Sequence, residues 1–123
     1  MRILVVDDNA ANLDLMLYLL RSFGHDPEGI ADGIAALERA RTGDFELVLA
    51  DILMPGMDGY EFARLFKADA ALASTPLVAV TALAMPADRK RADEAGFDGY
   101  ITKPIEPRTF VAQIEAFLRA GSA

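Results

Sequence analysis

The sequence predicts an α/β domain in which one five-stranded parallel sheet lies between two layers of helices. Short apolar runs alternate with amphipathic helical stretches along the chain, which is the pattern of βαβ units. The run Leu47–Ala50 is apolar at every position, as in strands that are buried on both faces of a parallel sheet. Because right-handed crossovers connect such strands, helices are expected on both faces. The length of 123 residues corresponds to a single domain.

The individual elements follow from the same alternation. Strands are expected near residues 2–6, 26–31, 46–50, 76–80 and 98–101, and helices near residues 10–23, 33–41, 58–67, 87–95 and 107–119. The second strand is the weakest prediction, because the stretch His25–Gly29 has low β-propensity. Asn9 or Asn12 can cap the first helix, and Asp58-Gly59 offers a turn followed by a helix cap. The domain is expected to cover residues 1–120, with residues 121–123 as a frayed C-terminal tail.

The first helix is apolar on two sides. Its sheet-facing residues at helical spacing are expected to be Leu13, Met16, Leu17 and Leu20. The opposite side carries Ala11, Leu15, Tyr18 and Leu19. Scattered apolar side chains are ordinary on protein surfaces. We prefer a second interpretation, in which these residues form an exposed patch beside the carboxyl edge of the sheet, suited to docking another helix.

The last two helices differ in how much apolar surface they offer. The last helix is expected to bury Phe110, Ile114, Phe117 and Leu118. The fourth helix, Pro86 to Gly96, offers mainly alanines between charged residues. Such a helix is either a weakly anchored, mobile element or merely a well-solvated one, and the composition favours neither interpretation.

The composition excludes several functional classes. A net charge of −7 argues against nucleic-acid binding, which needs a basic face. The absence of cysteine excludes disulfides and thiolate chemistry, and it fits a cytoplasmic protein. No run approaches the roughly 20 apolar residues of a membrane span, and Met1-Arg2 leads straight into the first strand with no secretory signal. The single histidine, His25, supports neither a Ser-His-Asp triad nor a zinc site, and is interpreted as a surface turn residue.

Four of the predicted strands end in polar side chains. The first ends in Asp7-Asp8, the third in Asp51, the fourth in Thr81 and the last in Lys103. Because the carboxyl ends of parallel strands meet at one edge, these side chains are expected to converge there. Each feature alone is ordinary, since a strand-end aspartate often only caps a helix. Their combination at four separate strand ends in one compact domain is what indicates a site.

Clustered carboxylates favour a bound hard cation, because it offsets their mutual repulsion. Mg²⁺ prefers oxygen ligands and uses one or two carboxylates. Asp8, Asp51 and a backbone carbonyl just past Asp51 would supply them, with Asp7 acting from outside the ligand set or through water. A carboxylate can also attack phosphorus to give an aspartyl phosphate. The cation and Lys103 would then neutralise phosphoryl oxygens, and Thr81 would hydrogen-bond another. The Lys103-Pro104 pair is a candidate for a cis peptide bond.

The chain resembles the receiver domain of bacterial two-component response regulators over essentially its whole length. The motifs that carry this resemblance are Val5-Val6-Asp7-Asp8-Asn9, Asp51-Ile52-Leu53-Met54-Pro55-Gly56-Met57-Asp58-Gly59, Val80-Thr81-Ala82 and Tyr100-Ile101-Thr102-Lys103-Pro104-Ile105. The resemblance implies a (βα)5 flavodoxin-like three-layer sandwich with strand order 2-1-3-4-5. The Ala82-Leu83-Ala84-Met85 stretch and the Lys103-Pro104-Ile105 ending are most similar to receivers of hybrid kinases and to single-domain regulators.

The resemblance also implies residue roles. Asp51 would be the phosphoacceptor, and Asp8, Asp51 and the Leu53 carbonyl would bind Mg²⁺ beside Asp7. Thr81 and Lys103 would bind the phosphoryl group, and Thr81 with Tyr100 would form a conformational switch that alters the surface of the fourth helix, last strand and last helix.

The implied reaction takes a phosphoryl group from a phosphohistidine on a histidine kinase or a histidine phosphotransfer protein, which would dock on the first-helix patch. The chain would supply the catalytic groups without being a multiple-turnover enzyme. With no output domain in the sequence, the expected output is docking to an unknown protein target, with a weak homodimer left open. Leu53 and Leu83 are apolar where a hydrolytic water would need orienting, so self-dephosphorylation is expected to be slow.

Three alternatives were weighed against this interpretation. A Mg²⁺-dependent phosphatase with an aspartyl nucleophile would need a second carboxylate two residues after Asp51, where the chain has Leu53. A flavin-binding module would need a phosphate-cradling loop after the first strand, and Asp7-Asp8 would repel the phosphate. A receiver fold that no longer accepts phosphate is disfavoured because all five candidate polar residues are present.

Overall fold

The fold consists of one parallel sheet between two helical layers. The computed structural model describes residues 1–121, in which strands and helices alternate. The elements are β1 (Arg2–Val6), α1 (Ala10–Ser22), β2 (Asp26–Ile30), α2 (Gly33–Thr42), β3 (Leu47–Ala50), α3 (Gly59–Ala68), β4 (Leu77–Thr81), α4 (Pro86–Ala95), β5 (Gly99–Thr102) and α5 (Pro107–Gly121). The strands pair in parallel in the order β2-β1-β3-β4-β5. The predicted strand order and three-layer architecture are therefore confirmed.

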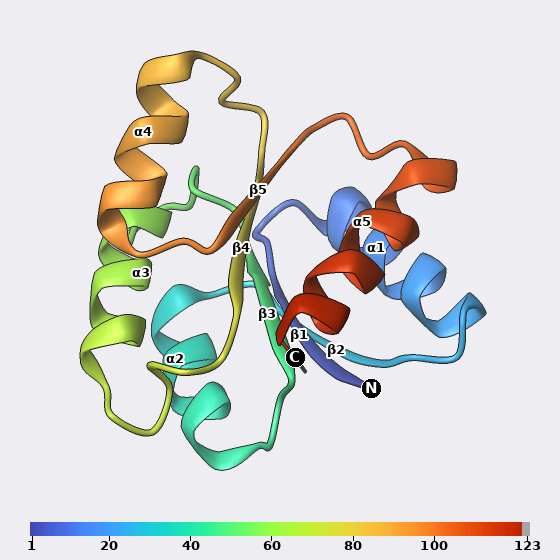
Figure 1. Cartoon of the computed structure of the whole chain (residues 1–123), viewed down its shortest axis with the longest axis horizontal. Helices are drawn as coiled ribbons and strands as arrows, with labels where there is room; N and C mark the ends of the chain where they lie inside the picture. The colour runs from blue at the N-terminus through green and yellow to red at the C-terminus, as the bar shows by residue number, and fades with distance from the viewer. Residues whose placement is uncertain (122–123) are drawn as a thin grey trace.

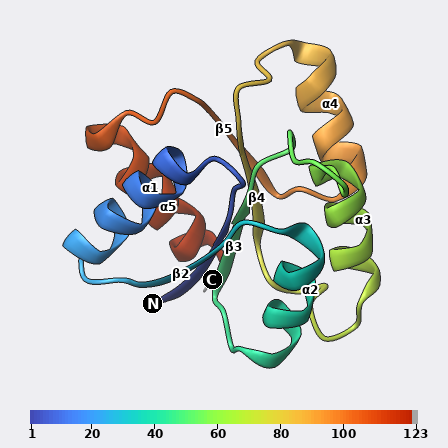
Figure 2. The same ribbon diagram turned by 180° about the vertical axis from the view of Figure 1, so that it is seen from behind.

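The sheet divides the hydrophobic core into two halves. Side chains alternate along a strand, so Ile3 and Val5 point to one face of β1 while Leu4 and Val6 point to the other. The first face is covered by α1 and α5, and the second by α2, α3 and α4, as Figures 1 and 2 show from opposite sides. Because both faces are buried, the central strands can be apolar at every position.

The edge strand β2 forms despite its weak sequence signal. All five of its residues align with β1, from Arg2 opposite Asp26 to Val6 opposite Ile30. Pro27 is tolerated because an edge strand leaves one side of its backbone unpaired. Gly29 lets α1 lie close, since a Cβ there would come within 3.0 Å of side-chain atoms of Leu17 and Leu13. Pairing and packing therefore override the low β-propensity of this segment.

Helix α1 corrects one part of the predicted docking patch. Asn9 caps the helix, and its side-chain oxygen accepts from the Asn12 backbone N–H at 3.0 Å. Leu19 is only 7% exposed and belongs to the core between α1, α5 and the sheet, so the prediction that it faces solvent is wrong. The predicted inward face is also imperfect, because Leu13 and Leu17 are half-buried. What stays accessible from the patch is Ala11, half-buried Leu15 and exposed Tyr18.

His25 was expected on the surface, but its side chain is only 10% exposed. It lies between α1 and β2, and its Nε2 is 3.0 Å from the Glu115 carboxylate of α5. This contact could not be predicted from the sequence, because the two residues lie 90 positions apart. Gly121, expected in the frayed tail, is the last residue of α5, and the rest of that tail, 122–123, lies outside the described residues.

The two helices flanking β5 are anchored very differently. Helix α5 buries Phe110, Val111, Ile114 and Leu118, while Phe117 is half-buried against Gly99. Helix α4 buries only Ala92 and Ala95, as its composition predicted. It ends at Gly96, whose φ of 118° is left-handed. None of the helices within residues 1–121 is long and apolar enough to cross a membrane.

Candidate functional site

Strand pairing brings the polar strand ends to one edge. Val6 of β1 aligns with Ala50 of β3, and the backbone N–H of Asp51 donates to the Val6 carbonyl at 3.0 Å. On the far side of β4, the backbone N–H of Lys103 donates to the Thr81 carbonyl at 2.8 Å. The residues that follow β1, β3 and β5 therefore sit together with the last residue of β4, as the sequence predicted.

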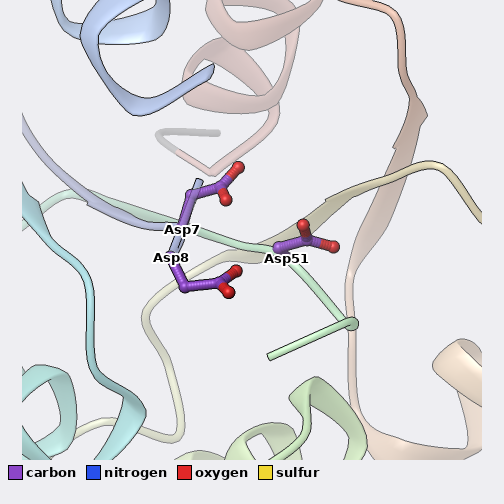
Figure 3. A group of neighbouring side chains, drawn as sticks. All are labelled: Asp7, Asp8 and Asp51. Carbon is purple, nitrogen blue, oxygen red and sulfur yellow. The ribbon is translucent and has the colours of Figure 1, made fainter. Parts of the chain in front are cut away.

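Three carboxylates gather at this edge (Figure 3). Asp7, Asp8 and Asp51 each place a carboxylate oxygen within 4.8 Å of the others. Asp7 is completely buried and Asp51 nearly so, whereas Asp8 is exposed. Buried carboxylates need compensating charge or hydrogen bonds, because burial strongly disfavours an isolated ion. The cluster thus combines two buried carboxylates with a third, Asp8, that is exposed to solvent.

Lys103 supplies part of that compensation. Its Nζ donates to Asp7 Oδ2 and to Asp51 Oδ2, both at 2.8 Å. Burial of the ammonium acts to lower its pKa, but the hydrogen bonds and charges of Asp51 and Asp7 outweigh it and leave the pKa of Lys103 raised. Lys103 is therefore a fixed positive charge between two carboxylates. Its peptide bond to Pro104 is cis, which confirms the sequence-based suggestion.

Backbone donors orient the same two carboxylates. Asp7 Oδ1 accepts from the Asn9 N–H at 2.9 Å, and Asp51 Oδ1 accepts from the Leu53 N–H at 3.1 Å. Each carboxylate is thus held at one oxygen by a loop amide and at the other by Lys103. Such preorganisation costs nothing at the moment of reaction.

Thr81 and Tyr100 meet at the loop after β4. The buried Thr81 hydroxyl accepts from the Leu83 N–H at 3.4 Å, and the Tyr100 hydroxyl donates to the Leu83 carbonyl. Tyr100 is half-buried and packs against the α2–α4 side of the core. Both side chains therefore contact one residue, Leu83, which sequence reasoning had considered only as an apolar position near the site.

Gly59 brings α3 against the site more tightly than the sequence revealed. Asp58 caps α3 by accepting from the Glu61 N–H at 2.9 Å, as predicted. The Gly59 N–H donates to the Ile52 carbonyl at 2.8 Å. A Cβ on Gly59 would lie 2.4 Å from Ile52 Cα and 2.7 Å from the Asp51 carbonyl oxygen. Only glycine permits this approach, which couples the first turn of α3 to the residue that follows the central strand.

The donor set fits a magnesium ion. Mg²⁺ takes oxygen ligands, keeps several waters and needs only one or two carboxylates. The three aspartates provide close carboxylate oxygens, and the exposure of Asp8 leaves the cluster accessible from solvent. No nitrogen or sulfur ligand that would favour a softer metal belongs to this cluster of described residues.

A flavodoxin-like sheet with an acidic pocket at its carboxyl edge is the architecture of a phosphoacceptor signalling module. The family model of the response regulator receiver domain matches residues 3–115. The chain belongs to this family, and its general function is phosphoacceptor signal transduction in two-component systems. Receiver domains of this kind bind Mg²⁺ in the acidic pocket and work in systems linked to histidine kinases.

Curated relatives include regulators and a sensor. The chain is 40% identical over 118 residues to the DNA-binding response regulator MtrA of Mycolicibacterium paratuberculosis, covering 96% of this chain and 51% of that protein. It is 34% identical to the polar-differentiation response regulator DivK of Brucella ovis, covering 94% of each chain. It is also 42% identical over 110 residues to the sensor protein GacS of Pseudomonas syringae, covering 87% of this chain and 12% of that protein. The chain thus spans about half the length of the MtrA relatives that it matches.

Solved structures of related proteins have the same fold. The receiver domain of the sensor histidine kinase PA1611 from Pseudomonas aeruginosa, with a magnesium ion in its active-site cleft, has a TM-score of 0.88 at 30% identity, covering 96% of this chain and 97% of that one. The chemotaxis protein CheY4 of Vibrio cholerae has a TM-score of 0.89 at 27% identity, covering 94% and 97%.

Proposed function

We propose that Asp51 accepts a phosphoryl group from a phosphohistidine in a Mg²⁺-dependent reaction. One observation carries this proposal: Lys103 Nζ holds Asp51 and Asp7 at 2.8 Å each, in a pocket that a cation can reach beside Asp8. In the transfer, the phosphorus–nitrogen bond of the donor breaks as a bond forms between phosphorus and an Asp51 oxygen, and the electron pair leaves on the imidazole. The chain's task is to position these groups and balance their charge.

Asp8, Asp51 and the Leu53 carbonyl would hold Mg²⁺, with Asp7 acting through water. The bound ion would neutralise phosphoryl oxygens that the three carboxylates would otherwise repel. Lys103 would neutralise another phosphoryl oxygen, moving from its carboxylate contacts toward the new anion. Thr81 ends the neighbouring strand, and its hydroxyl would donate a hydrogen bond to a third. The magnesium in the active-site cleft of the PA1611 receiver supports a Mg²⁺ site at this edge of the sheet.

The output would be a population shift. When Thr81 donates to the phosphoryl group, the loop containing Leu83 follows, because the Thr81 hydroxyl and the Tyr100 hydroxyl both bind that residue. Tyr100 then changes its contacts, and the surface made by α4, β5 and α5 is altered. The scant burial of α4 supports its role as the moving element.

The phosphodonor would be a histidine kinase or a histidine phosphotransfer protein. Its helical bundle would dock on α1 at the accessible residues Ala11, Leu15 and Tyr18, beside the acidic pocket. The altered surface would act by docking to a downstream protein, and a weak homodimer is one form such docking could take. The match to the sensor GacS supports a kinase-linked donor.

The test of the reaction uses acetyl phosphate as donor, and intact mass as readout. Wild-type protein with Mg²⁺ should gain one phosphoryl group, and Asp51→Asn should gain none. Asp44→Asn, an exposed aspartate in the turn between α2 and β3, is the matched control and should be labelled like wild type. A wild-type chain that stays unmodified contradicts the proposal, as does label retained by Asp51→Asn. Repeated turnover of small phosphate esters would favour a phosphatase instead.

We also infer that the phosphorylated form is long-lived. Leu53, in the loop after β3, is 53% exposed, and Leu83, in the loop after β4, has a half-buried apolar side chain. Neither side chain can orient an attacking water. Leu53→Asn should therefore shorten the half-life of the aspartyl phosphate several-fold, measured as loss of phosphoryl mass after donor removal. Leu65→Asn, at an exposed leucine of α3 away from the loop, should leave the half-life unchanged. An unchanged half-life in Leu53→Asn would contradict the inference.

A further inference from the structure

Two arginine–tyrosine contacts attach α4 to the rest of the domain. The guanidinium carbon of Arg91 lies 4.0 Å from the centre of the Tyr60 ring, and that of Arg89 lies 5.1 Å from the centre of the Tyr100 ring. Both distances are within the range of cation–π attraction. Since only Ala92 and Ala95 of this helix are buried, these two contacts add to an otherwise sparse attachment.

The Tyr60 hydroxyl is buried in an unusual way. The side chain is only 4% exposed, and its hydroxyl has no hydrogen-bond partner among residues 1–121. Burial, together with the charges of Asp88 and Asp58, raises the pKa of the Tyr60 phenol against the opposing effect of Arg91. The group is therefore a neutral donor that loses its hydration without gaining an acceptor. A buried unsatisfied hydroxyl makes this arrangement less favourable than one in which it finds a partner.

Tyr60 also sits next to the phosphoacceptor. It follows Gly59, which lies so close to the Ile52 backbone and the Asp51 carbonyl that no side chain would fit between them. A shift of the segment after Asp51 must therefore move the first turn of α3. Because the Tyr60 ring lies under Arg91, that movement reaches α4 without passing through Thr81 or Tyr100.

We propose that the Tyr60–Arg91 contact is a second route from Asp51 to α4, and that α4 leaves Tyr60 when Asp51 carries a phosphoryl group. The proposal rests on the proposed function of Asp51. In the present arrangement the contact holds α4 in place while the Tyr60 hydroxyl stays unsatisfied. Displacement of α4 exposes that hydroxyl to water, which favours the phosphorylated conformation. The ring of Tyr60 thus stabilises the present position of α4, whereas its hydroxyl favours the phosphorylated conformation.

Hydrogen–deuterium exchange of the α4 amides, with and without beryllium fluoride and Mg²⁺, tests the proposal. In wild type, beryllium fluoride should speed exchange in residues 86–96. Arg91→Ala should exchange fast without beryllium fluoride, and the added effect of the phosphate mimic should be largely lost. Lys90→Ala, an exposed neighbour with no ring contact among the described interactions, should behave like wild type. A full wild-type response in Arg91→Ala would overturn the proposal.

Tyr60→Phe separates the hydroxyl from the ring. It keeps the face under Arg91 and removes only the unsatisfied donor, so it should favour the present arrangement. Beryllium fluoride should then bind about fivefold more weakly than to wild type, the lower end of typical coupling between sites. Tyr18→Phe, at an exposed tyrosine, is the matched control and should leave this affinity unchanged. Equal affinity in Tyr60→Phe and wild type would overturn the role of the hydroxyl.

The same measurements distinguish a failure of the proposed function from a failure of the second route. A wild-type chain that binds no beryllium fluoride contradicts phosphoacceptor chemistry at Asp51, and this inference falls with it. A wild-type chain that binds the mimic and accepts phosphate but shows no change in α4 contradicts both the second route and the proposed switch, while the phosphoacceptor chemistry at Asp51 stands. An α4 response that is unchanged in Arg91→Ala contradicts the second route alone.

Discussion

Helices α4 and α5 flank the same edge strand, β5, yet they are held by opposite means. Helix α5 inserts large side chains such as Phe110 and Ile114 into the core, whereas α4 contributes two alanine methyl groups. Helix α4 instead relies on arginines that lie over tyrosine rings. The comparison teaches that two helices on the same strand can differ widely in how much apolar surface anchors them. Deep burial anchors α5, whereas α4 is anchored by shallow contacts.

The largest expected effect comes from the fixed helix. Ile114 is fully buried among residues of β1, β3, β4 and α1, so Ile114→Ala removes apolar contacts and leaves a cavity. We expect the free energy of unfolding to fall by about 2–5 kcal/mol. Urea denaturation followed by circular dichroism measures this loss. Gln113→Ala, at the exposed neighbouring position, should change the free energy by less than about 0.5 kcal/mol.

A smaller effect is expected from the shallowly anchored helix α4. Ala92→Gly removes one buried methyl group and adds backbone freedom inside α4, which should cost about 1 kcal/mol. Local exchange of the α4 amides should rise more than global unfolding does, because the helix can open without the core. The same urea and exchange measurements apply. A global loss as large as that of Ile114→Ala would erase the distinction between the two helices.

The smallest effect is expected from an ion pair outside both helices. Arg39 of α2 donates to the two oxygens of Glu28 on β2, at 2.5 and 2.9 Å. These hydrogen bonds, opposed by partial burial and aided by the charges of Arg39 and Arg2, lower the pKa of Glu28. Because the pKa of Glu28 is depressed in the folded protein, the pair stabilises the fold fully at pH values above the usual pKa of glutamate. This stabilisation is lost as the pH falls through the lowered pKa of Glu28.

The comparison of Arg39→Gln with wild type measures this contribution. The difference in urea midpoint between the two proteins should be full at about pH 7 and should shrink as the pH falls below the usual pKa of glutamate. Arg64→Gln, at an exposed arginine of α3, should show no such pH-dependent difference. A difference for Arg39→Gln that persists or grows in acid would show that the pair does not act through the Glu28 carboxylate.

The pocket was predictable because its geometry follows from topology. Once parallel strands are recognised, the residues that follow them must share one edge, whatever their separation along the chain. The strand β2 was hard to predict, because pairing with β1, rather than its own β-propensity, makes this segment a strand. Sequence periodicity placed Leu19 on the solvent side of α1, but α5 covers that side and buries it.

Contacts between side chains of elements that are distant in the sequence could not be predicted from it. The His25–Glu115 pair joins the start of β2 to α5, and the Arg91–Tyr60 contact joins α4 to α3. Neither is encoded in a motif or a repeat, because each depends on how two elements that are distant in the sequence pack together. The low burial of α4, in contrast, was visible in its alanine-rich composition, which left its mobility open and gave its attachment no explanation.

The hydrogen-bonded ion pair of Lys103 and Asp7 joins two residues that lie 96 positions apart in the sequence. A ribosome releases the amino-terminal end first, so Asp7 and Asp51 emerge long before the ammonium group that neutralises them. Until the last strand docks, the growing chain has carboxylates that cannot be buried without penalty. The three charged side chains can therefore meet only after Lys103 has been synthesised and β5 has paired with β4.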